Sequence, residues 1–320
     1  MKWLVFALAF MLLLGCPAEE APPSGEEEAA PGQEGHFEIT GGEGAVVSEG
    51  ELPEIPEIPA TEYAQNPNAD LEVYFINVGQ RNVQGDAILI KKGDVDILID
   101  AGPDISEKDL VDFLYEKGVD DIEVLVSTHD DPEHYGGMKY VSEKFPIGEI
   151  WRSTEGSSSY STYLNSLGAE GVKEVWQGDT EDINGMVFTV LNPVRGEDRF
   201  YDPTNDGVVL KLEDRGLCVL FTGDILYPAQ QLVAPQAVDC QIVQFPNHGM
   251  SSGLAHIDYF FDQIEPDVVV ISGGPEDWTK SRITLTEKAE LRDIVVLENY
   301  DGEAVVITYD GDRYTAGIEE

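Results

Sequence analysis

From Leu71 onward the sequence predicts a layered α/β sandwich folded as one domain. Short apolar runs rich in Val and Ile are separated by Gly and Asp turns, which is typical of strands. Amphipathic stretches with helical spacing occur among these runs without strict strand–helix alternation, which favours stacked layers in a single domain. With 320 residues, the chain is long enough to bury a large core.

Three strands open the domain, and a helix follows them. The predicted strands are LEVYFINV (71–78), DAILIKK (86–92) and VDILIDAG (95–102). The helix covers residues 105–119, where Ser106 with Asp109 resembles a capping box and Gly118 ends the helix. Its predicted buried face consists of Leu110, Phe113 and Leu114.

The later elements repeat this mixture, and no repeat with a period of 20–50 residues is apparent. Further strands are predicted at residues 122–128, 147–153, 186–193, 207–214, 217–224, 239–249 and 266–274. Helices are predicted at residues 134–145 and 284–294. Residues 303–317 close the domain as a hairpin with an Asp-Gly turn.

The first 16 residues predict a signal peptide. Lys2 precedes the apolar stretch from Trp3 to Leu14, which is too short to span a bilayer. Leu-Leu-Gly-Cys, ending at Cys16, resembles the lipobox of prokaryotic lipoproteins, which implies cleavage before Cys16 and lipidation of its thiol. We therefore expect an extracytoplasmic protein that a lipid on Cys16 anchors to the cell membrane. The alternative is a plain secretory signal with an incidental cysteine.

Residues 17–70 predict a disordered acidic tether. They contain 14 Asp and Glu, no Lys or Arg, and frequent Pro, Gly and Ala, so they cannot bury enough apolar surface to offset chain entropy. The tether is either a solvated spacer or a specific binding arm.

The domain itself is also strongly acidic. From Leu71 on, the sequence contains 48 Asp and Glu but only 18 Lys and Arg. This excess repels nucleic-acid phosphates unless metal ions intervene, which disfavours long nucleic acid as a partner.

Two cysteines besides Cys16 lie in apolar runs of the domain. Cys218 stands in GLCVLF and Cys240 in VDCQIVQF. Outside the cytoplasm the two could pair, but two buried free thiols are an equally good interpretation, and no disulfide framework is visible.

Two histidines and three carboxylates crowd into the run His129-Asp130-Asp131-Pro132-Glu133-His134, directly after a predicted strand. A tight loop at a strand end can converge such side chains, and Gly136-Gly137 permits close backbone approach. Imidazole and carboxylate together bind Zn²⁺, Mn²⁺ or Fe. The run is therefore a candidate metal-binding loop. The alternative is an acidic surface turn with exposed histidines.

Two later strand ends carry side chains of the same kind. VLFTGDI ends a strand in Gly223-Asp224, and IVQFPNHG ends another in Asn247-His248-Gly249. Open α/β scaffolds place function at the ends of their strands. A third histidine and an isolated acid at such ends therefore support one shared site.

Together these motifs resemble the metallo-β-lactamase-fold hydrolases, and specifically the ComEC-like branch related to the competence protein of DNA uptake. The similarity covers about Leu71 to Gly317, in the family's order. Its motifs are VYFINVGQ…GDAILIKKGDVDILIDAG, STHDDPEHYGG, TNDGVVLKLEDRGLCVLFTGDI, FPNHGMSS and DGEAVVITYDG. The resemblance implies a four-layer αββα metallo-β-lactamase sandwich as the single domain of residues 71–320.

The resemblance also implies a site for one or two divalent ions, Zn²⁺ or Mn²⁺. The implied ligands are His129 and Asp131 for one ion, Glu133 and His134 for the other, Asp224 between them, and His248. Glu133 and Asp224 are the implied catalytic residues. Around them, Asp100 either orients a ligand histidine or serves as a turn acid, and Asn205 either contacts substrate or caps a turn.

The sequence departs from the branch's pattern at several positions. Asn77 stands where an Asp is usual, and RNVQ is inserted before Gly85-Asp86. Glu133 replaces an Asp, and Asn247 replaces one histidine of a His-His pair while remaining a candidate substrate contact. The loss of one imidazole puts the second metal ion in doubt.

The chemistry that the resemblance implies is hydrolysis by a metal-activated hydroxide. A phosphodiester, in nucleic acid or in a small molecule, is the expected substrate. One alternative is a carboxylic ester, lactone or thioester. Another is a non-catalytic, lipid-tethered binding protein with a degenerate metal site.

Overall fold

The computed structural model describes residues 63–79, 83–250, 252, 256–272 and 279–319. The predicted signal peptide, the lipidation site Cys16 and the tether up to residue 62 lie outside the described residues. No helix among the described residues is long and apolar enough to cross a membrane.

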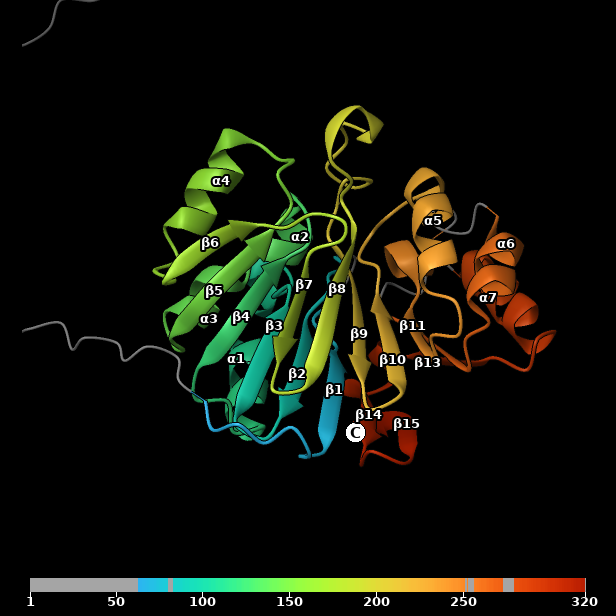
Figure 1. Cartoon of the computed structure of the whole chain (residues 1–320), viewed down its shortest axis with the longest axis horizontal. Coiled ribbons are helices and arrows are strands. Elements are labelled where there is room, and N and C mark those ends of the chain that lie inside the picture. The colour runs from blue at the N-terminus through green and yellow to red at the C-terminus, as the bar shows by residue number, and fades with distance from the viewer. Residues whose placement is uncertain (1–62, 80–82, 251, 253–255, 273–278, 320) are drawn as a thin grey trace, which may run out of the picture. The chain divides into compact units, whose positions relative to one another are not determined.

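Two mixed sheets form the domain (Figure 1). The strands of the first sheet are β1 (Leu71–Ile76), β2 (Ile88–Lys92), β3 (Val95–Ile99), β4 (Ile122–Ser127), β5 (Ile147–Arg152), β6 (Gly171–Glu174), β14 (Ala304–Tyr309) and β15 (Tyr314–Glu319). Those of the second are β7 (Thr180–Ile183), β8 (Met186–Asn192), β9 (Val209–Asp214), β10 (Leu217–Phe221), β11 (Ile242–Gln244), β12 (Val268–Ile271) and β13 (Val295–Glu298). The spatial orders are β15-β14-β1-β2-β3-β4-β5-β6 and β13-β12-β11-β10-β9-β8-β7.

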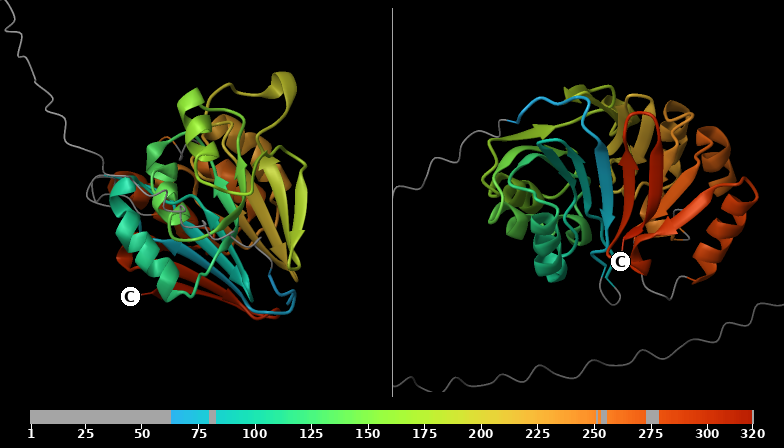
Figure 2. Two further views of the ribbon diagram at one scale, coloured as in Figure 1. Left: turned by 90° about the vertical axis from the view of Figure 1, so that its left-hand side faces the viewer. Right: turned by 90° about the horizontal axis from the view of Figure 1, so that it is seen from below.

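Helices cover the outer faces of both sheets (Figure 2). They are α1 (Glu107–Glu116), α2 (Pro132–Tyr135), α3 (Met138–Ser142), α4 (Ser158–Asn165), α5 (Tyr227–Val233), α6 (Ile257–Ile264) and α7 (Thr279–Glu290). One apolar cluster fills the space between the sheets, a second lies under α1, α3 and α4, and a third lies under α5, α6 and α7. These clusters make four layers, so the predicted αββα sandwich is confirmed.

Both faces of the central strands are buried, which explains why their sequences are almost continuously apolar. On β1, Val73 and Phe75 point into the cluster between the sheets, while Tyr74 and Ile76 point toward the helices on the outer face. Successive side chains of a strand alternate between its faces, so each face needs its own apolar set. The ring of Tyr74 meets Phe113 of α1 edge-on at 5.7 Å between centroids.

Strand direction brings the functional loops to one edge. Strands β3, β4 and β5 run parallel to one another, as do β10, β11 and β12. Because parallel strands present their carboxyl ends at the same edge, the loops after them gather there. Each half of the sandwich thus supplies a set of loops for one site.

The predicted helix over residues 105–119 forms as α1, with the predicted residues on its buried face. Gly118 ends it in the left-handed region with φ +74°. The predicted capping box is wrong: Ser106 makes no side-chain cap to the helix, and its hydroxyl donates instead to the carbonyl of Val78. The hydroxyl of Ser106 therefore makes a tertiary hydrogen bond instead of the helix cap that the local sequence pattern predicted.

The region of residues 132–145 differs from its prediction. Residues 132–135 form the helical turn α2 where a loop was expected, and α2 and α3 replace one helix over 134–145. At Gly137, an added Cβ would lie 2.1 Å from the carbonyl oxygen of Ala101. Only glycine permits this approach, so the Gly-Gly pair serves to place α2 against the loop that follows β3.

A disulfide joins Cys218 on β10 to Cys240 just before β11. This decides between the two interpretations that the sequence left open. The bond links adjacent parallel strands whose carboxyl ends both carry site residues, and Cys240 is fully buried.

The domain begins earlier than the predicted boundary at residue 71. Tyr63 packs against the core between the sheets, and the backbone N–H of Asn66 donates to the side chain of Asn184 at 2.6 Å. Arg215 donates to the carbonyl of Ala69 at 2.8 Å. Residues 63–70 therefore lie on the domain, because their backbone groups find partners there.

Two buried carboxyl groups lie side by side on β3 and β4. The backbone N–H of Asp96 donates to Glu123 Oε2 at 2.8 Å. Burial raises the pKa of Glu123 to about 7 and that of Asp96 to about 6. Both values exceed those of the unfolded chain, about 4. The stability that these protons contribute is therefore complete below pH about 4 and is lost as the pH rises through about 7.

Glu123→Gln should raise the melting temperature at pH 8, because the amide buries no charge. We expect a gain on the order of 1–2 kcal/mol that mostly disappears at pH 5. Thermal melts at the two pH values measure it. Glu116→Gln, on the exposed side of α1, should change the melting temperature little at either pH. A Glu123→Gln protein that melts below wild type at pH 8 would contradict the expectation.

Candidate metal centre

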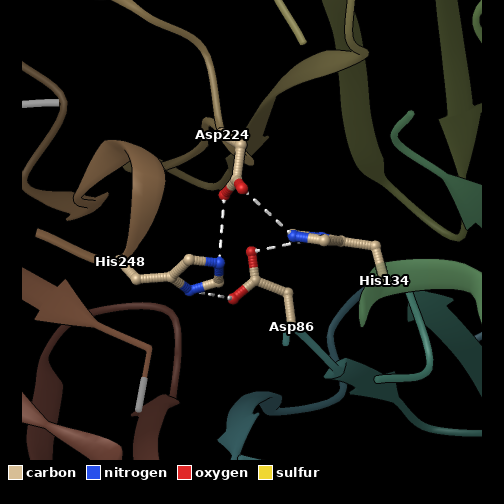
Figure 3. A group of neighbouring side chains, drawn as sticks. All are labelled: Asp86, His134, Asp224 and His248. Atoms are coloured by element: carbon tan, nitrogen blue, oxygen red, sulfur yellow. Dashed lines mark ion pairs between the residues drawn. The ribbon is translucent and has the colours of Figure 1, made fainter. Parts of the chain in front are cut away.

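Four side chains converge at the edge where the two sheets meet (Figure 3). Asp86 and His134 come from the first half of the sandwich, and Asp224 and His248 from the second. Each offers one potential ligand atom, and the four atoms lie within 4.8 Å of one another. Asp86, His134 and His248 are buried, and the side chain of Asp224 is 12% exposed.

The four side chains form a ring of alternating carboxylate and imidazole groups (Figure 3). Asp224 Oδ2 lies 3.3 Å from His134 Nε2, and Asp224 Oδ1 lies 3.2 Å from His248 Nε2. On the opposite side, Asp86 Oδ1 lies 3.6 Å from His248 Nδ1, and Asp86 Oδ2 lies 3.8 Å from His134 Nδ1. Asp224 therefore faces the Nε2 atoms, and Asp86 faces the Nδ1 atoms.

The backbone around Asp86 is placed by a glycine. An added Cβ on Gly85 would lie 2.3 Å from the carbonyl oxygen of Glu133. This contact brings Asp86, two residues before β2, against α2, where His134 lies. On the other side of the centre, Asn247 and His248 adopt left-handed conformations with φ of +52° and +51°. Such conformations are costly for residues other than glycine and concentrate at functional sites.

Several buried polar atoms of the ring make no hydrogen bond within the described part of the chain. They are Asp86 Oδ1, Asp224 Oδ1, His134 Nε2 and both ring nitrogens of His248. Buried polar atoms are nearly always satisfied, so a group of unsatisfied ones facing each other requires an explanation. Imidazole nitrogens and carboxylate oxygens are the ligands of Zn²⁺ and Mn²⁺, so a divalent cation fits these residues.

Asp100 orients His134 from behind. Its Oδ2 lies 2.8 Å from His134 Nδ1, and it also accepts from the hydroxyl and the backbone N–H of Thr128, at 2.6 and 2.9 Å. A carboxylate on Nδ1 fixes the ring and directs Nε2 toward the centre. Of the two roles that the sequence left open, the geometry favours orientation of a ligand histidine.

Charge balance dominates the centre. Burial disfavours ionised groups here, but the charges of His248 and His134 outweigh it and hold the pKa of Asp224 well below its usual range. Burial likewise opposes protonation of His134, but the charge of Asp224 and the hydrogen bond to Asp100 raise the pKa of His134 well above its usual value. The carboxylates therefore draw protons onto the imidazoles, and a divalent cation can replace those protons.

His129 lies beside the ring, although it is not one of its four members. It is buried, its Nε2 lies 4.0 Å from Asp224 Oδ2, and its ring centroid is 4.4 Å from that of His134. Burial and the neighbouring charge of His134 lower the pKa of His129. A neutral imidazole is the form that binds a metal.

Asp131 and Glu133 stand at the margin of the centre. Asp131 caps α2, its side chain accepting the backbone N–H of Glu133 at 2.9 Å. Glu133 is half-buried, and burial and the charge of Asp131 raise its pKa. Neither carboxylate joins the four-membered cluster. The assignment of these two residues and the two loop histidines to separate ions stays a prediction.

Asn205 and Asn247 hold the loop that contains Asp224. The backbone N–H of Leu226 donates to Asn205 Oδ1 at 3.1 Å, and Asn247 Nδ2 donates to the carbonyl of Asp224 at 3.4 Å. For Asn205, the structure shows the turn contact rather than a place in the cluster. His256 lies apart from the ring and stacks on Tyr227, with centroids 3.8 Å apart.

Sequence reasoning missed Asp86. Its signal was the Gly85-Asp86 pair at the start of a strand, which was noted as part of a motif and given no role. The carboxylate looked like the polar first residue of a strand, since the residues that face it lie far along the chain.

The sequence profile described as metallo-beta-lactamase superfamily matches residues 81–296. The chain belongs to this superfamily. Recombination protein 2 of Haemophilus influenzae is 28% identical over 208 residues, which cover 63% of this chain and 24% of that protein. ComE operon protein 3 of Bacillus subtilis is 26% identical over 229 residues, which cover 63% of this chain and 28% of that protein. These relatives support the resemblance to the ComEC-like branch.

The chain spans about a quarter of the length of these two relatives. Among solved structures, the metallo-beta-lactamase fold protein YhfI of Bacillus subtilis matches with a TM-score of 0.52 at 12% identity, covering 75% of this chain and all of that one. A mutant of the CmlA beta-hydroxylase matches with a TM-score of 0.51 at 14% identity, covering 72% of this chain and 52% of that one. At these identities the matches show the shared fold.

Chelation should lower the melting temperature of the metal-loaded metallo-β-lactamase domain, and Zn²⁺ or Mn²⁺ should restore it. Binding to the folded state alone stabilises it by about 2.7 kcal/mol at a hundredfold excess over Kd. His134→Ala and Asp224→Ala should abolish the response, whereas His256→Ala, outside the ring, should keep it. Calorimetric melts with and without chelator measure the effect. If neither chelator nor added Zn²⁺ or Mn²⁺ shifts the wild-type melting temperature, and no metal co-purifies, the site is vestigial.

Proposed function

We propose that this chain is a metal-dependent hydrolase of phosphodiesters that acts outside the cytoplasm, anchored by a lipid on Cys16. The observation that carries the hydrolase proposal is the ring of two imidazoles and two carboxylates with its unsatisfied buried atoms. Membership of the metallo-β-lactamase superfamily supports metal-assisted hydrolysis as its chemistry.

His134, His248 and Asp224 would hold the ion, with Asp86 as a further ligand or as the partner of His248 Nδ1. When bound, a divalent cation polarises the scissile group and lowers the pKa of a coordinated water. Asp100 keeps the ring of His134 in the tautomer that leaves Nε2 free to coordinate. Asp224, between two Nε2 atoms, supplies the negative charge that retains the cation.

Glu133 is suited to proton transfer. Its carboxylate is half-buried, and it interacts electrostatically with His134, His248 and Asp224. A carboxyl group that faces both the centre and solvent can take a proton from water and deliver it to a leaving oxygen.

A phosphodiester is the proposed substrate class because of the relatives. Their names refer to recombination and to the ComE operon, and recombination acts on nucleic acids. From Leu71 on, the 48 Asp and Glu outnumber the 18 Lys and Arg, and the resulting negative charge repels a long polyanion. We therefore propose a small phosphodiester or a short single strand rather than long duplex DNA.

Asp224→Asn should reduce hydrolysis of bis(p-nitrophenyl) phosphate by about 100-fold or more, since it removes the charge that retains the ion. Release of p-nitrophenol by the metal-loaded protein measures it. Asp262→Asn, on the exposed surface of α6, should leave the rate unchanged. A wild-type protein that cleaves p-nitrophenyl acetate or a lactone but no phosphodiester would replace the proposed substrate with an ester. One that binds metal but cleaves nothing would favour the binding protein.

Cys16→Ser should release the protein from membranes into the soluble extracytoplasmic fraction, because the proposed lipid is attached to the thiol of Cys16. Cell fractionation and immunoblotting measure the distribution. The matched variant Pro17→Ser changes the neighbouring residue and should stay membrane-bound. If Cys16→Ser protein also remains in the membrane with the 15 residues before position 16 uncleaved, the prediction of a lipid anchor fails.

A further inference from the structure

Gln244, the last residue of β11, lies directly behind the metal centre. Its side chain is buried and makes hydrogen bonds at both ends of its amide. Its Nε2 donates to Asp86 Oδ2 at 2.7 Å. Its Oε1 accepts the backbone N–H groups of Thr222 and Gly223, at 3.0 and 3.2 Å.

These contacts reach both carboxylates of the ring. One end of the amide fixes Asp86 directly, which leaves Asp86 Oδ1 turned toward His248 Nδ1, 3.6 Å away. The other end holds the turn at Thr222-Gly223, which immediately precedes Asp224 and places Gly223 at φ +51°. A single side chain thus connects the segment just before β2 of one sheet with the turn just after β10 of the other.

The polarity of the contacts makes the amide hard to replace. A carboxylate on Asp86 requires a donor, whereas two backbone N–H groups require an acceptor, and only an amide of this length offers both at once. Gln244 also donates to Ser272 Oγ at 3.3 Å, so its remaining proton has a partner. Its orientation is therefore determined by four groups.

We propose that Gln244 is a positioning residue of the metal centre: it sets the angle of the Asp86 carboxylate and, through the turn at Thr222-Gly223, that of Asp224. The inference rests on the proposed metal-dependent function and deepens it. Partners of metal ligands fix ligand geometry, and their loss typically weakens metal affinity 10- to 100-fold. Gln244 acts on two carboxylates of the centre at once, so the upper part of that range is expected.

The test compares Gln244→Met with Gln241→Met in the full mature chain. Gln241 is a matched control because it directly precedes β11, the strand that Gln244 ends. Its Oε1 also accepts a backbone N–H, that of Cys218, at 2.7 Å. Both variants lose an acceptor for a backbone N–H, so both should melt at a lower temperature. Gln244→Met alone should raise the Kd for Zn²⁺ and Mn²⁺, by about 10- to 100-fold, in isothermal titration.

One further measurement separates positioning from general damage. The visible absorption spectrum of the Co²⁺-loaded protein reports ligand geometry and should change in Gln244→Met but not in Gln241→Met. If Gln244→Met does not fold, Gln244→Asn, one methylene shorter, takes its place with the same expected direction.

The outcomes distinguish the inference from the proposed function. The inference would be overturned if Gln244→Met kept the wild-type Kd and Co²⁺ spectrum and melted at a temperature as low as that of Gln241→Met. Gln244 would then only stabilise the fold. Equal loss of affinity in both variants would overturn it as well. If the wild-type chain binds neither Zn²⁺ nor Mn²⁺, the proposed function itself is refuted, and the inference with it.

Discussion

The site depends on the burial of three carboxylates, Asp86, Asp100 and Asp224, around two imidazoles where the two sheets meet. Negative charges this close and this far from water are stable only with compensating positive charge. Protons on His134 and His248 can supply it, and so can a divalent cation. The same constraint explains why the ring nitrogens face carboxylates on both sides and why several of these atoms lack hydrogen-bond partners within the described residues.

Such a ring demands accurate placement of parts that are distant in sequence, and the sandwich provides it. Asp86 and His134 belong to the first sheet and its loops, Asp224 and His248 to the second. The apolar cluster between the sheets sets their separation, and the disulfide between Cys218 and Cys240 ties together two strands that lead into the site. A close-packed interior transmits small displacements, so sheet packing and ligand geometry are coupled.

The sequence predicted most of the strands and three of the four members of the ring, because each of these leaves a local signal. The strands β6, β7 and β13 were not predicted, and the four layers were implied by the family resemblance. His134 belongs to a crowded run of ionisable residues after an apolar strand, and Asp224 and His248 each follow an apolar strand as single ionisable residues. Asp86 escaped notice since it begins a predicted strand and its hydrogen-bond partner Gln244 lies 158 residues away. An Asp before a Pro, as at Asp131, can indicate a metal ligand or a helix cap. In the structure Asp131 caps α2, with Pro132 at the first position of that helix.

The acidity of the chain and its metal centre affect cations and substrates differently. Both attract divalent ions, so the surface charge aids loading of the site. For a phosphodiester the two effects oppose each other, since the surface repels the phosphate that the centre would bind. Screening limits this repulsion to about 8 Å at physiological ionic strength. A small diester would bring one phosphate through that zone, whereas each added phosphate of a polymer would bring further repulsion, so the surface charge supports the proposed preference for short substrates.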